Sequence, residues 1–418
     1  METASLRRLS EAELRALAER LDLTPTPTTA HGDLLLRVEK ALLGRGESLV
    51  AEGTLELVKG GNGYLRQATH SYLAGPDDVH VSPAQVKRFG LRTGDVIRGA
   101  VRPAKPWEKF LALAQVEAVN GDTPDAALRR GNFDTLRPKY PDQRIRLESV
   151  SGGLAMRVAD LIAPLGKGQR GLIVAPPRAG KTLFLQRMAN AIAENHPEIV
   201  LIVLLIDERP EEVTDFIATV PSAEVVASTF DEVPKRHVQV ADMVIEKAKR
   251  LVEQGRDVVI LLDSITRLAR AHNAVTPMSG KILSGGVDAK ALEKPKRFFG
   301  AARRIDGGGS LTIVATALVN TGSRMDEVIF EEFKGTGNQE IVLDRDIANR
   351  RIYPAIEINK SGTRKEELLL SEKERNRIFL LRHFLGDMAP EDATQFLLRK
   401  LSATQSNEEF FQRMAEGG

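Results

Sequence analysis

The chain has 418 residues, of which 42% are hydrophobic, so it can bury more than one hydrophobic core and we predict two or three domains. Its 59 basic and 57 acidic residues leave a formal net charge of +2, which excludes a global positive field as the basis of nucleic-acid binding. The absence of cysteine excludes disulfides, thiolate metal sites and thiol catalysis.

The sequence does not predict a membrane span. The longest aliphatic run, residues 199–206, is far shorter than the roughly 20 residues that cross a bilayer, and it predicts a buried strand. Residues 1–18 alternate charged and apolar positions and lack the continuous apolar core of a signal peptide. We therefore expect a cytoplasmic protein that has no membrane partner.

The N-terminal segment, residues 1–47, predicts a small helical domain. Ser10 can cap a helix whose apolar positions recur at helical spacing, at Leu14, Leu17 and Leu21. A second helix is expected over residues 34–43, where apolar side chains again form one stripe and glycines follow.

Residues 48–119 predict a small β-barrel of the OB type, as in cold-shock domains. Short alternating strands are separated there by Gly, Pro and Asp turns such as residues 60–63 and 75–78. Four or five strands in about 70 residues fit a barrel of this size. Residues 120–152 lack clear periodicity and contain three prolines, so we predict a linker there.

Residues 153–418 predict an α/β domain. Buried aliphatic strands alternate with helical stretches, for example residues 238–252, and this alternation is typical of a parallel, doubly wound sheet. The expected strands are residues 171–175, 199–206, 224–228, 257–263 and 310–317.

Residues 175–182, APPRAGKT, follow a predicted strand and open a predicted helix, which is the context of a Walker A loop. Ala175 stands where the general pattern has Gly. The backbone N–H groups of such a loop surround phosphate oxygens, Lys181 reaches the outer phosphates and the Thr182 hydroxyl holds magnesium. We therefore predict a site for ATP and Mg²⁺.

Two further strand ends carry carboxylates. Asp263 ends a buried strand and would support the metal, although many parallel strands end in Asp without that role. Glu208 follows the strand over residues 199–206, which we expect beside the P-loop, and we predict that it orients and polarises the attacking water. Asp207 could exchange roles with it.

Arg351 and Arg364 are candidates for an arginine finger, the cation that meets charge on the γ-phosphoryl group. Both lie beyond the last core strand. This position suggests that they act in the site of a neighbouring subunit, and the alternative is that they are ordinary surface arginines.

The barrel carries side chains suited to single-stranded nucleic acid. Residues two apart on a strand share a face, and aromatic rings there stack bases with about 1–3 kcal/mol per base. Carboxylates can accept from the cytosine amino group. The alternative is that Tyr64 and Phe110 belong to the barrel core. The same-face pairs are Tyr64 with Arg66, Asp78 with His80, and Glu108 with Phe110.

Two loops of the α/β domain form a second candidate surface. Residues 281–286, KILSGG, end in glycines behind the leading cation Lys281, and residues 320–324 end in Arg324. Such loops can move with nucleotide state while they touch a phosphate backbone, and they are equally typical of plain flexible loops. Arg267 and Arg270 are expected to be interface or structural charges.

Several segments together resemble the Rho family of transcription termination factors. The resemblance extends from about residue 50 to the C-terminus, and the N-terminal helices are compatible with it but less distinctive. The matching segments are residues 71–78, 175–182, 205–213, 261–270, 297–303 and 361–365.

The resemblance implies a homohexameric ring with a RecA-like ATPase motor and ATP bound between subunits. Arg351 and Arg364 then resemble sensor and finger arginines that act across the interface, Glu208 acts on the water, and Tyr353 matches an adenine-stacking aromatic. Asp263 and Thr182 would hold the Mg²⁺ that arrives with ATP. The implied nucleotide-binding residues are Pro177, Arg178, Ala179, Gly180, Lys181, Thr182, Leu183, Arg209 and Tyr353.

The resemblance also implies a function: an RNA-dependent ATPase and helicase that binds pyrimidine-rich nascent RNA and terminates transcription by the RNA polymerase elongation complex. The implied central-channel contacts are Lys281, Ile282, Ser284, Gly285 and Arg324, the last of which stands where the family carries a lysine.

Asn62 and His80 depart from the family pattern, which often has aromatic residues at both positions. Stacking would then depend more heavily on Tyr64 and Phe110, and we expect RNA capture with a weakened or altered base preference. The alternatives are another hexameric RecA-like ATPase, of the rotary or secretion type, which needs no RNA-binding barrel, and a passive RNA-binding or anti-termination protein, which needs no competent ATP site.

Overall fold

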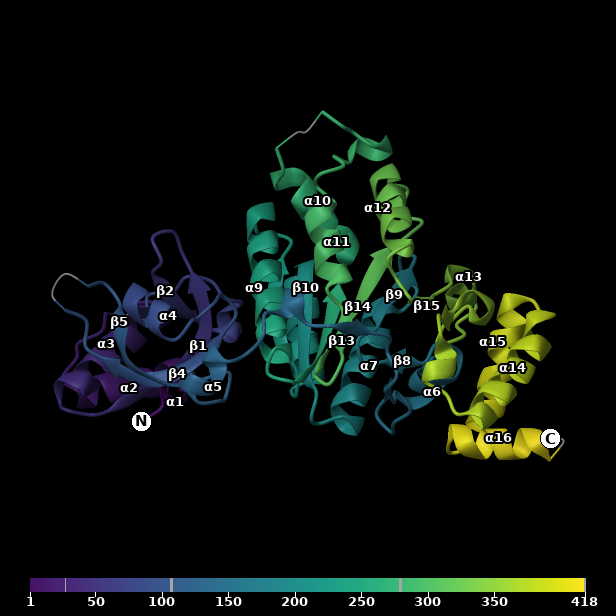
Figure 1. Cartoon of the computed structure of the whole chain (residues 1–418), viewed down its shortest axis with the longest axis horizontal. Coiled ribbons are helices and arrows are strands. Elements are labelled where there is room, and N and C mark those ends of the chain that lie inside the picture. Colours follow the sequence, from purple (N-terminus) through teal and green to yellow (C-terminus); the bar gives the residue numbers. More distant parts are fainter. Residues whose placement is uncertain (27, 106–107, 278–279, 417–418) are drawn as a thin grey trace. The chain divides into compact units, whose positions relative to one another are not determined.

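A computed structural model describes residues 1–26, 28–105, 108–277 and 280–416 (Figure 1). The chain forms two compact units. Unit 1 comprises Met1–Thr135 with Asp242–Gln254, and unit 2 comprises Leu136–Ala241 with Gly255–Gly418. The inserted piece, Asp242–Gln254, contains the C-terminal part of one long helix and the turn after it, so unit 1 includes residues that the sequence placed in the α/β domain.

Unit 1 begins with three helices. Ser10 caps the second of them in a capping box with Glu13, as its position predicted, because its hydroxyl accepts from the Glu13 amide and the Glu13 carboxylate accepts from the Ser10 amide. Leu14 of the second helix and Leu34 of the third lie in one core with the barrel strands. The helices are α1 (Thr3–Arg7), α2 (Glu11–Arg20) and α3 (His31–Gly44).

The rest of unit 1 is a closed barrel with strand order β1-β2-β3-β5-β4, which confirms the predicted OB-type fold. Its curvature brings backbones close together: a Cβ at Gly99 would lie 2.0 Å from the Gln115 carbonyl oxygen, so only glycine fits there. The elements are β1 (Leu49–Leu57), β2 (Gly63–Arg66), β3 (Val79–Val81), α4 (Pro83–Arg88), β4 (Val96–Arg102) and β5 (Leu111–Val119).

The segment predicted as a linker carries short elements and divides between the two units after Thr135. In unit 2, β6 pairs with β13 at the side of the main sheet, and β7 pairs with β8. Regular structure therefore begins earlier in unit 2 than the sequence pattern suggested. The elements are α5 (Pro124–Leu128), β6 (Pro138–Lys139), β7 (Arg144–Ile145), β8 (Leu165–Gly166) and β13 (Arg303–Ile305).

Unit 2 is built on a sheet with the strand order β11-β10-β12-β14-β9-β15-β16. The first six strands run parallel to their neighbours, which confirms the predicted parallel sheet. All five expected strands are present: four are apolar runs buried on both faces, and β11, at the edge of the sheet, is half-buried. The strands are β9 (Arg170–Ala175), β10 (Val200–Glu208), β11 (Glu224–Thr229), β12 (Asp257–Asp263), β14 (Ser310–Leu318), β15 (Gln339–Val342) and β16 (Gly362–Thr363).

One expectation about this sheet is wrong. The strand that ends in Glu208, β10, does not lie beside the P-loop strand β9, because β12 and β14 lie between them. Sequential α/β segments often pair as neighbours, but strand order is a tertiary property that the sequence pattern does not encode.

Helices cover both faces of the sheet, and the last three pack together at the C-terminal end of unit 2 (Figure 1). Among the described residues no helix is long and apolar enough to cross a membrane. The helices of this part are α6 (Gly153–Ile162), α7 (Lys181–Asn195), α8 (Pro210–Thr219), α9 (Pro234–Val252), α10 (Ile265–Val275), α11 (Glu293–Gly300), α12 (Arg324–Lys334), α13 (Arg345–Asn349), α14 (Glu372–Gly386), α15 (Pro390–Ser402) and α16 (Asn407–Ala415).

Candidate nucleotide site and RNA-binding surfaces

The P-loop connects β9 to α7. Gly180 is the N-cap of α7 with φ of 87°, and Arg178 also has a positive φ, of 66°. These left-handed residues turn the chain sharply, so that the first amides of α7, which have no partner within the helix, border the loop. Pro177, Arg178 and Gly180 are exposed while Ala179 is buried. The loop therefore has the form of an anion-binding helix N-terminus.

Lys181 lies between two buried carboxylates. Its Nζ is 3.0 Å from Glu208 Oε1 and 2.5 Å from Asp263 Oδ1. Thr316 on β14 donates a hydrogen bond to the same Asp263 oxygen at 2.7 Å. Burial opposes the charge on Lys181, but the two carboxylates outweigh it and raise the Lys181 pKa. The structure thus brings together the lysine and the two acidic residues that the sequence singled out.

Glu208 has the environment of a proton acceptor. Burial raises its pKa, and the neighbouring Asp263 charge raises it further, against the lowering effect of Lys181. A carboxylate with a raised pKa can take a proton from water near neutral pH.

Asp207 is engaged elsewhere. Its φ is 58°, and the pairing of β10 with β11 is irregular between Ile206 and Glu208, so consecutive carboxylates are directed differently. Arg267 on α10 donates to Asp207 Oδ2 at 2.7 Å and to the Asp207 carbonyl oxygen at 2.5 Å. Its Nε lies 3.7 Å from Glu208 Oε1. This arrangement favours Glu208 over Asp207 for the proton-accepting role.

Sequence reasoning did not place Arg267 at this site. It was expected to be a structural or interface charge, yet it borders both acidic residues that follow Ile206. The sequence did contain a signal for this location: Arg267 is four residues after Asp263, on the first turn of the helix that follows β12. Arg270, in contrast, pairs with Asp326 at 2.7 Å and is structural, as expected.

Thr182 and Asp263 supply the oxygen ligands that Mg²⁺ prefers. The Thr182 hydroxyl donates to Glu212 at 3.3 Å, so Glu212 on the first turn of α8 also borders this site. Among the described residues no cluster of three or more His, Cys, Asp or Glu side chains could hold a metal by itself. The residues present therefore fit a magnesium ion whose coordination is completed by nucleotide phosphates and water.

A small cavity of about 130 Å³ adjoins the P-loop. Ala179, Gly180 and Leu183 line one side, and Tyr353 lines the other. A Cβ at Gly180 would lie 3.7 Å from the Tyr353 ring. The Tyr353 ring is exposed next to the P-loop, and its predicted contact with the nucleotide base stays a prediction. Arg209, the N-cap residue of α8, is exposed next to Glu208 in the chain.

Neither finger candidate lines the cavity beside the P-loop. Arg351 is exposed in a left-handed conformation two residues before Tyr353. Arg364 lines a separate cavity of about 240 Å³ that contains no P-loop residue. Within the described ranges neither guanidinium has a side-chain partner. The structure therefore does not bring Arg364 to Lys181 within one chain.

The barrel rings form one cluster. The centroid of Tyr64 lies 5.6 Å from that of His80 and 5.2 Å from that of Phe110, and Arg66 lies over the Tyr64 ring at 5.1 Å. Tyr64 pairs directly with His80 across β2 and β3. Both Tyr64 and Phe110 are half-buried and lie outside the hydrophobic core, so the core alternative is wrong.

Both arginines beside these rings are paired with carboxylates. Arg66 binds Glu56 at 2.7 Å and also Asp78, and Arg66 and Asp78 are buried. Arg102 forms two hydrogen bonds with Glu108, which lowers the Glu108 pKa to about 2. Bases would therefore meet rings whose neighbouring arginines are already paired, with the exposed Lys109 ammonium 5.3 Å from the centre of the Phe110 ring.

Asn62 and His80 contact each other. His80 Nε2 lies 2.9 Å from Asn62 Oδ1, and burial lowers the His80 pKa, so the imidazole is neutral at pH 7. The two departures from the family pattern thus form one hydrogen-bonded pair that fixes the ring beside Tyr64.

The two loops of unit 2 lie against each other. A Cβ at Gly285 would be 2.8 Å from the Arg324 backbone, and Gly285 has a φ of 72°. Ile282 forms a bridge with Asp288 and leaves its side chain exposed. Lys281, Ser284 and Arg324 are likewise exposed. The predicted channel residues therefore form one surface near the start of α12 (Figure 1).

Comparison with known proteins decides the family. Residues 51–125 match the model of the Rho termination factor, RNA-binding domain. Over 417 residues the chain is 57% identical to transcription termination factor Rho of Pseudomonas aeruginosa and 54% identical to that of Escherichia coli strain K12, with 99% of each chain covered. The chain belongs to the Rho family.

Other matches of this Rho family member show the fold of its nucleotide-binding domain. Residues 155–363 match the ATP synthase alpha/beta family, nucleotide-binding domain. The assembled ATPase of the enteropathogenic E. coli type III secretion system aligns with a TM-score of 0.55 at 19% identity, over 75% of this chain and 79% of that one. An ATP synthase subunit of Nanoarcheaum equitans gives 0.52 at 20% identity, over 60% and 62%. Neither carries the full-length similarity of the Rho relatives, so the rotary or secretion alternative is less well supported.

Proposed function

We propose that this Rho family member is an ATP-driven motor that captures pyrimidine-rich single-stranded RNA, moves along it, unwinds it and terminates transcription by RNA polymerase. The observation that supports this most is the contact of Lys181 with the buried carboxylates Glu208 and Asp263 at the P-loop, in the same chain as the Tyr64 ring cluster. ATP hydrolysis follows from the first and RNA capture from the second.

Binding of ATP would exchange the partners of Lys181. The β- and γ-phosphates replace Glu208 and Asp263 around its ammonium, while the P-loop amides donate to phosphate oxygens. Asp263 and Thr182 would hold Mg²⁺, which would supply positive charge to neutralise the phosphates. Glu208, released from Lys181, is free to accept a hydrogen bond from water.

Hydrolysis would proceed by in-line attack. Glu208 takes a proton from the water, whose oxygen bonds to the γ-phosphorus while the bond from that phosphorus to the β–γ bridging oxygen breaks, which leaves ADP and phosphate. Arg364 of a neighbouring subunit would meet the charge that develops on the γ-phosphoryl oxygens. Its exposed position, away from Lys181 of its own chain, supports a homohexameric ring.

RNA would first meet the barrel. Bases stack on Tyr64 and Phe110, with the neutral His80 beside them, and each stacked base contributes about 1–3 kcal/mol. The exposed loops that contain Lys281 and Arg324 would contact the backbone inside the ring and shift with the nucleotide state. Contact with the RNA polymerase elongation complex would follow from movement along the nascent transcript.

The test is ATP hydrolysis measured with and without poly(C) RNA, together with the mass of the particle. We expect strong stimulation by RNA and a particle of six chains. Equal rates with and without poly(C) would favour the rotary or secretion alternative, and an absence of hydrolysis under both conditions would favour a passive RNA-binding protein.

A further inference from the structure

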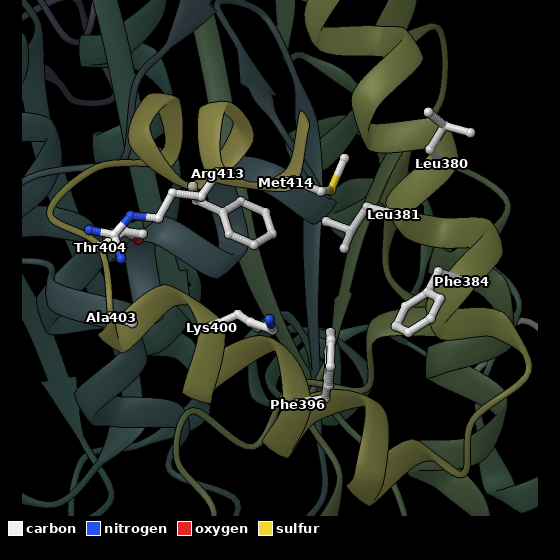
Figure 2. Close-up of a pocket in the computed structure, with 10 residues that line it drawn as sticks. Leu380, Leu381, Phe384, Phe396, Lys400, Ala403, Thr404, Arg413 and Met414 are labelled. Carbon is white, nitrogen blue, oxygen red and sulfur yellow. The ribbon is translucent and has the colours of Figure 1, made fainter. Parts of the chain in front are cut away.

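The three C-terminal helices enclose a cavity that the proposed motor cycle does not use. It measures about 670 Å³, within the range of small-ligand and peptide pockets, and lies wholly in unit 2. Figure 2 shows Leu381, Phe384 and Phe396 directed into one space between α14, α15 and α16. The rings of Phe384 and Phe396 are 5.2 Å apart.

Part of this apolar lining is open to solvent. Helix α14 is apolar on two sides, because Ile378 and Leu385 are buried inward while Leu380 and Phe384 remain 60% and 53% exposed. The two exposed side chains line the cavity one helical turn apart. Exposed bulky side chains grouped around a hollow mark a binding surface more often than scattered ones do.

The charges at this cavity have one sign. Its charged lining residues are Lys400 and Arg413, and no carboxylate lines it. Lys400 lies 5.8 Å from the centre of the Phe396 ring and, within the described ranges, has no carboxylate partner. Arg413 pairs with Glu409 at 2.6 Å. The cavity therefore offers one uncompensated ammonium next to an apolar floor.

We propose that this C-terminal cavity docks an amphipathic helix of a partner protein, with bulky apolar side chains on one face and an Asp or Glu beside them. The walls are helices, which form a groove for a helix and provide no strand edge for an extended peptide. The apolar side chains fill the space between Phe384 and Phe396, and the carboxylate pairs with Lys400. Such a contact would connect the motor to a second protein at a surface separate from its ATP and RNA sites.

The probe is a fluorescein-labelled helical peptide of about 18 residues with Leu and Phe at i, i+3, i+4 and i+7 and Glu on the flanks. Its anisotropy is measured with the full-length protein. We expect micromolar binding, which weakens about tenfold in Phe384→Ser and in Lys400→Glu. The matched control is Phe379→Ser, because Phe379 is 68% exposed on the same helix but does not line the cavity.

Exchanging the charges of the peptide and of Lys400 distinguishes specific docking from nonspecific hydrophobic binding. A second peptide with Lys in place of every Glu should bind the natural chain about tenfold more weakly and recover on Lys400→Glu. Retained ATP hydrolysis shows that each variant is folded. If Phe384→Ser no longer hydrolyses ATP, Leu380→Ser takes its place in the experiment.

Three results would overturn the proposal. One is the absence of peptide binding at about 100 µM, where a micromolar ligand saturates its site. Another is an equal loss in Phe379→Ser, or no recovery in the charge exchange. The third is a change in particle mass caused by Phe384→Ser, which would make a second copy of the chain the occupant.

Discussion

The nucleotide site and the Tyr64 ring cluster of the barrel differ in how their charged residues would take part in binding. At the nucleotide site, the half-buried Lys181 is held between two buried carboxylates, in a position where phosphate and magnesium would replace the ion pairs. On the barrel, Arg66 and Arg102 are also paired with carboxylates, but the rings of Tyr64 and Phe110 stay accessible. We infer that ATP binds by exchanging ion pairs, whereas RNA binds the barrel by stacking that leaves them in place.

The largest effect should come from the proton acceptor. Glu208→Gln keeps the shape of the side chain but cannot take a proton, so we expect kcat to fall about 10²–10⁴-fold, as for loss of a general base. RNA affinity of the barrel should be unchanged, and both are measured on the same preparation. Asp207→Asn is the matched control and should lose far less; the reverse order would assign the base to Asp207.

Mixed rings test whether the site is shared between subunits. Lys181→Ala and Arg364→Ala should each abolish most turnover alone. If Arg364 acts on a neighbour, rings assembled from both variants contain some sites with an intact lysine and an intact arginine, and a substantial fraction of activity returns. Rates that stay at the level of the separate variants would place Arg364 in the site of its own chain.

The substitution Tyr64→Ala tests whether RNA binds the barrel by base stacking. This substitution removes the central ring between His80 and Phe110, so poly(C) affinity should fall by about 1–3 kcal/mol, the range measured for base-stacking aromatics. ATP hydrolysis without RNA should not change. Tyr140→Ala, an exposed tyrosine of unit 2, serves as the control in the same binding titration.

Unit 1 also contains a buried carboxylate that, unlike Glu208, forms no ion pair within the described residues. Glu39 is fully buried, neither carboxylate oxygen has a hydrogen-bond partner among the described residues, and burial raises its pKa to about 7. Because the folded pKa lies above the unfolded value of 4.5, ionisation destabilises the fold progressively as pH rises from 4.5 to 7.

Glu39→Gln removes that ionisation. We expect the variant to be more stable than the natural chain at pH 8, by on the order of 2 kcal/mol, and the advantage to vanish as pH falls toward 4.5. Hydrogen exchange of the α3 amides at several pH values measures it. Glu19→Gln, at an exposed position of α2, should show no such dependence, and a pH-independent effect of Glu39→Gln would refute the assignment.

Much of the fold followed from local patterns, whereas relations between elements did not. Local apolar patterns predicted five of the six parallel strands, all but β15, and the Ser10 cap predicted the start of α2, because both depend on neighbours in the chain. The separation of β10 from β9 depends on strand order, which local patterns do not contain. The sequence therefore predicted which fold forms more accurately than how its strands are ordered.

The same distinction between local patterns and tertiary contacts applies to the candidate site. Lys181, Glu208 and Asp263 were selected from strand ends and a loop motif, and the fold brings them together. The contact of Arg267 with Asp207 and the burial of Arg66 against Asp78 are tertiary, so the sequence could suggest those residues but not their partners. The C-terminal cavity lacks any sequence motif and emerged only from the packing of α14, α15 and α16.

The most direct test of the account is ATP-driven strand displacement. A DNA strand is annealed downstream of a single-stranded, cytosine-rich RNA segment, and its release is followed after addition of ATP. We predict release by the natural chain that requires ATP and the cytosine-rich segment, and none by Lys181→Ala although it still binds the RNA. Release without ATP, or none by a preparation whose ATP hydrolysis is stimulated by RNA, would contradict the claim that hydrolysis moves the protein along RNA.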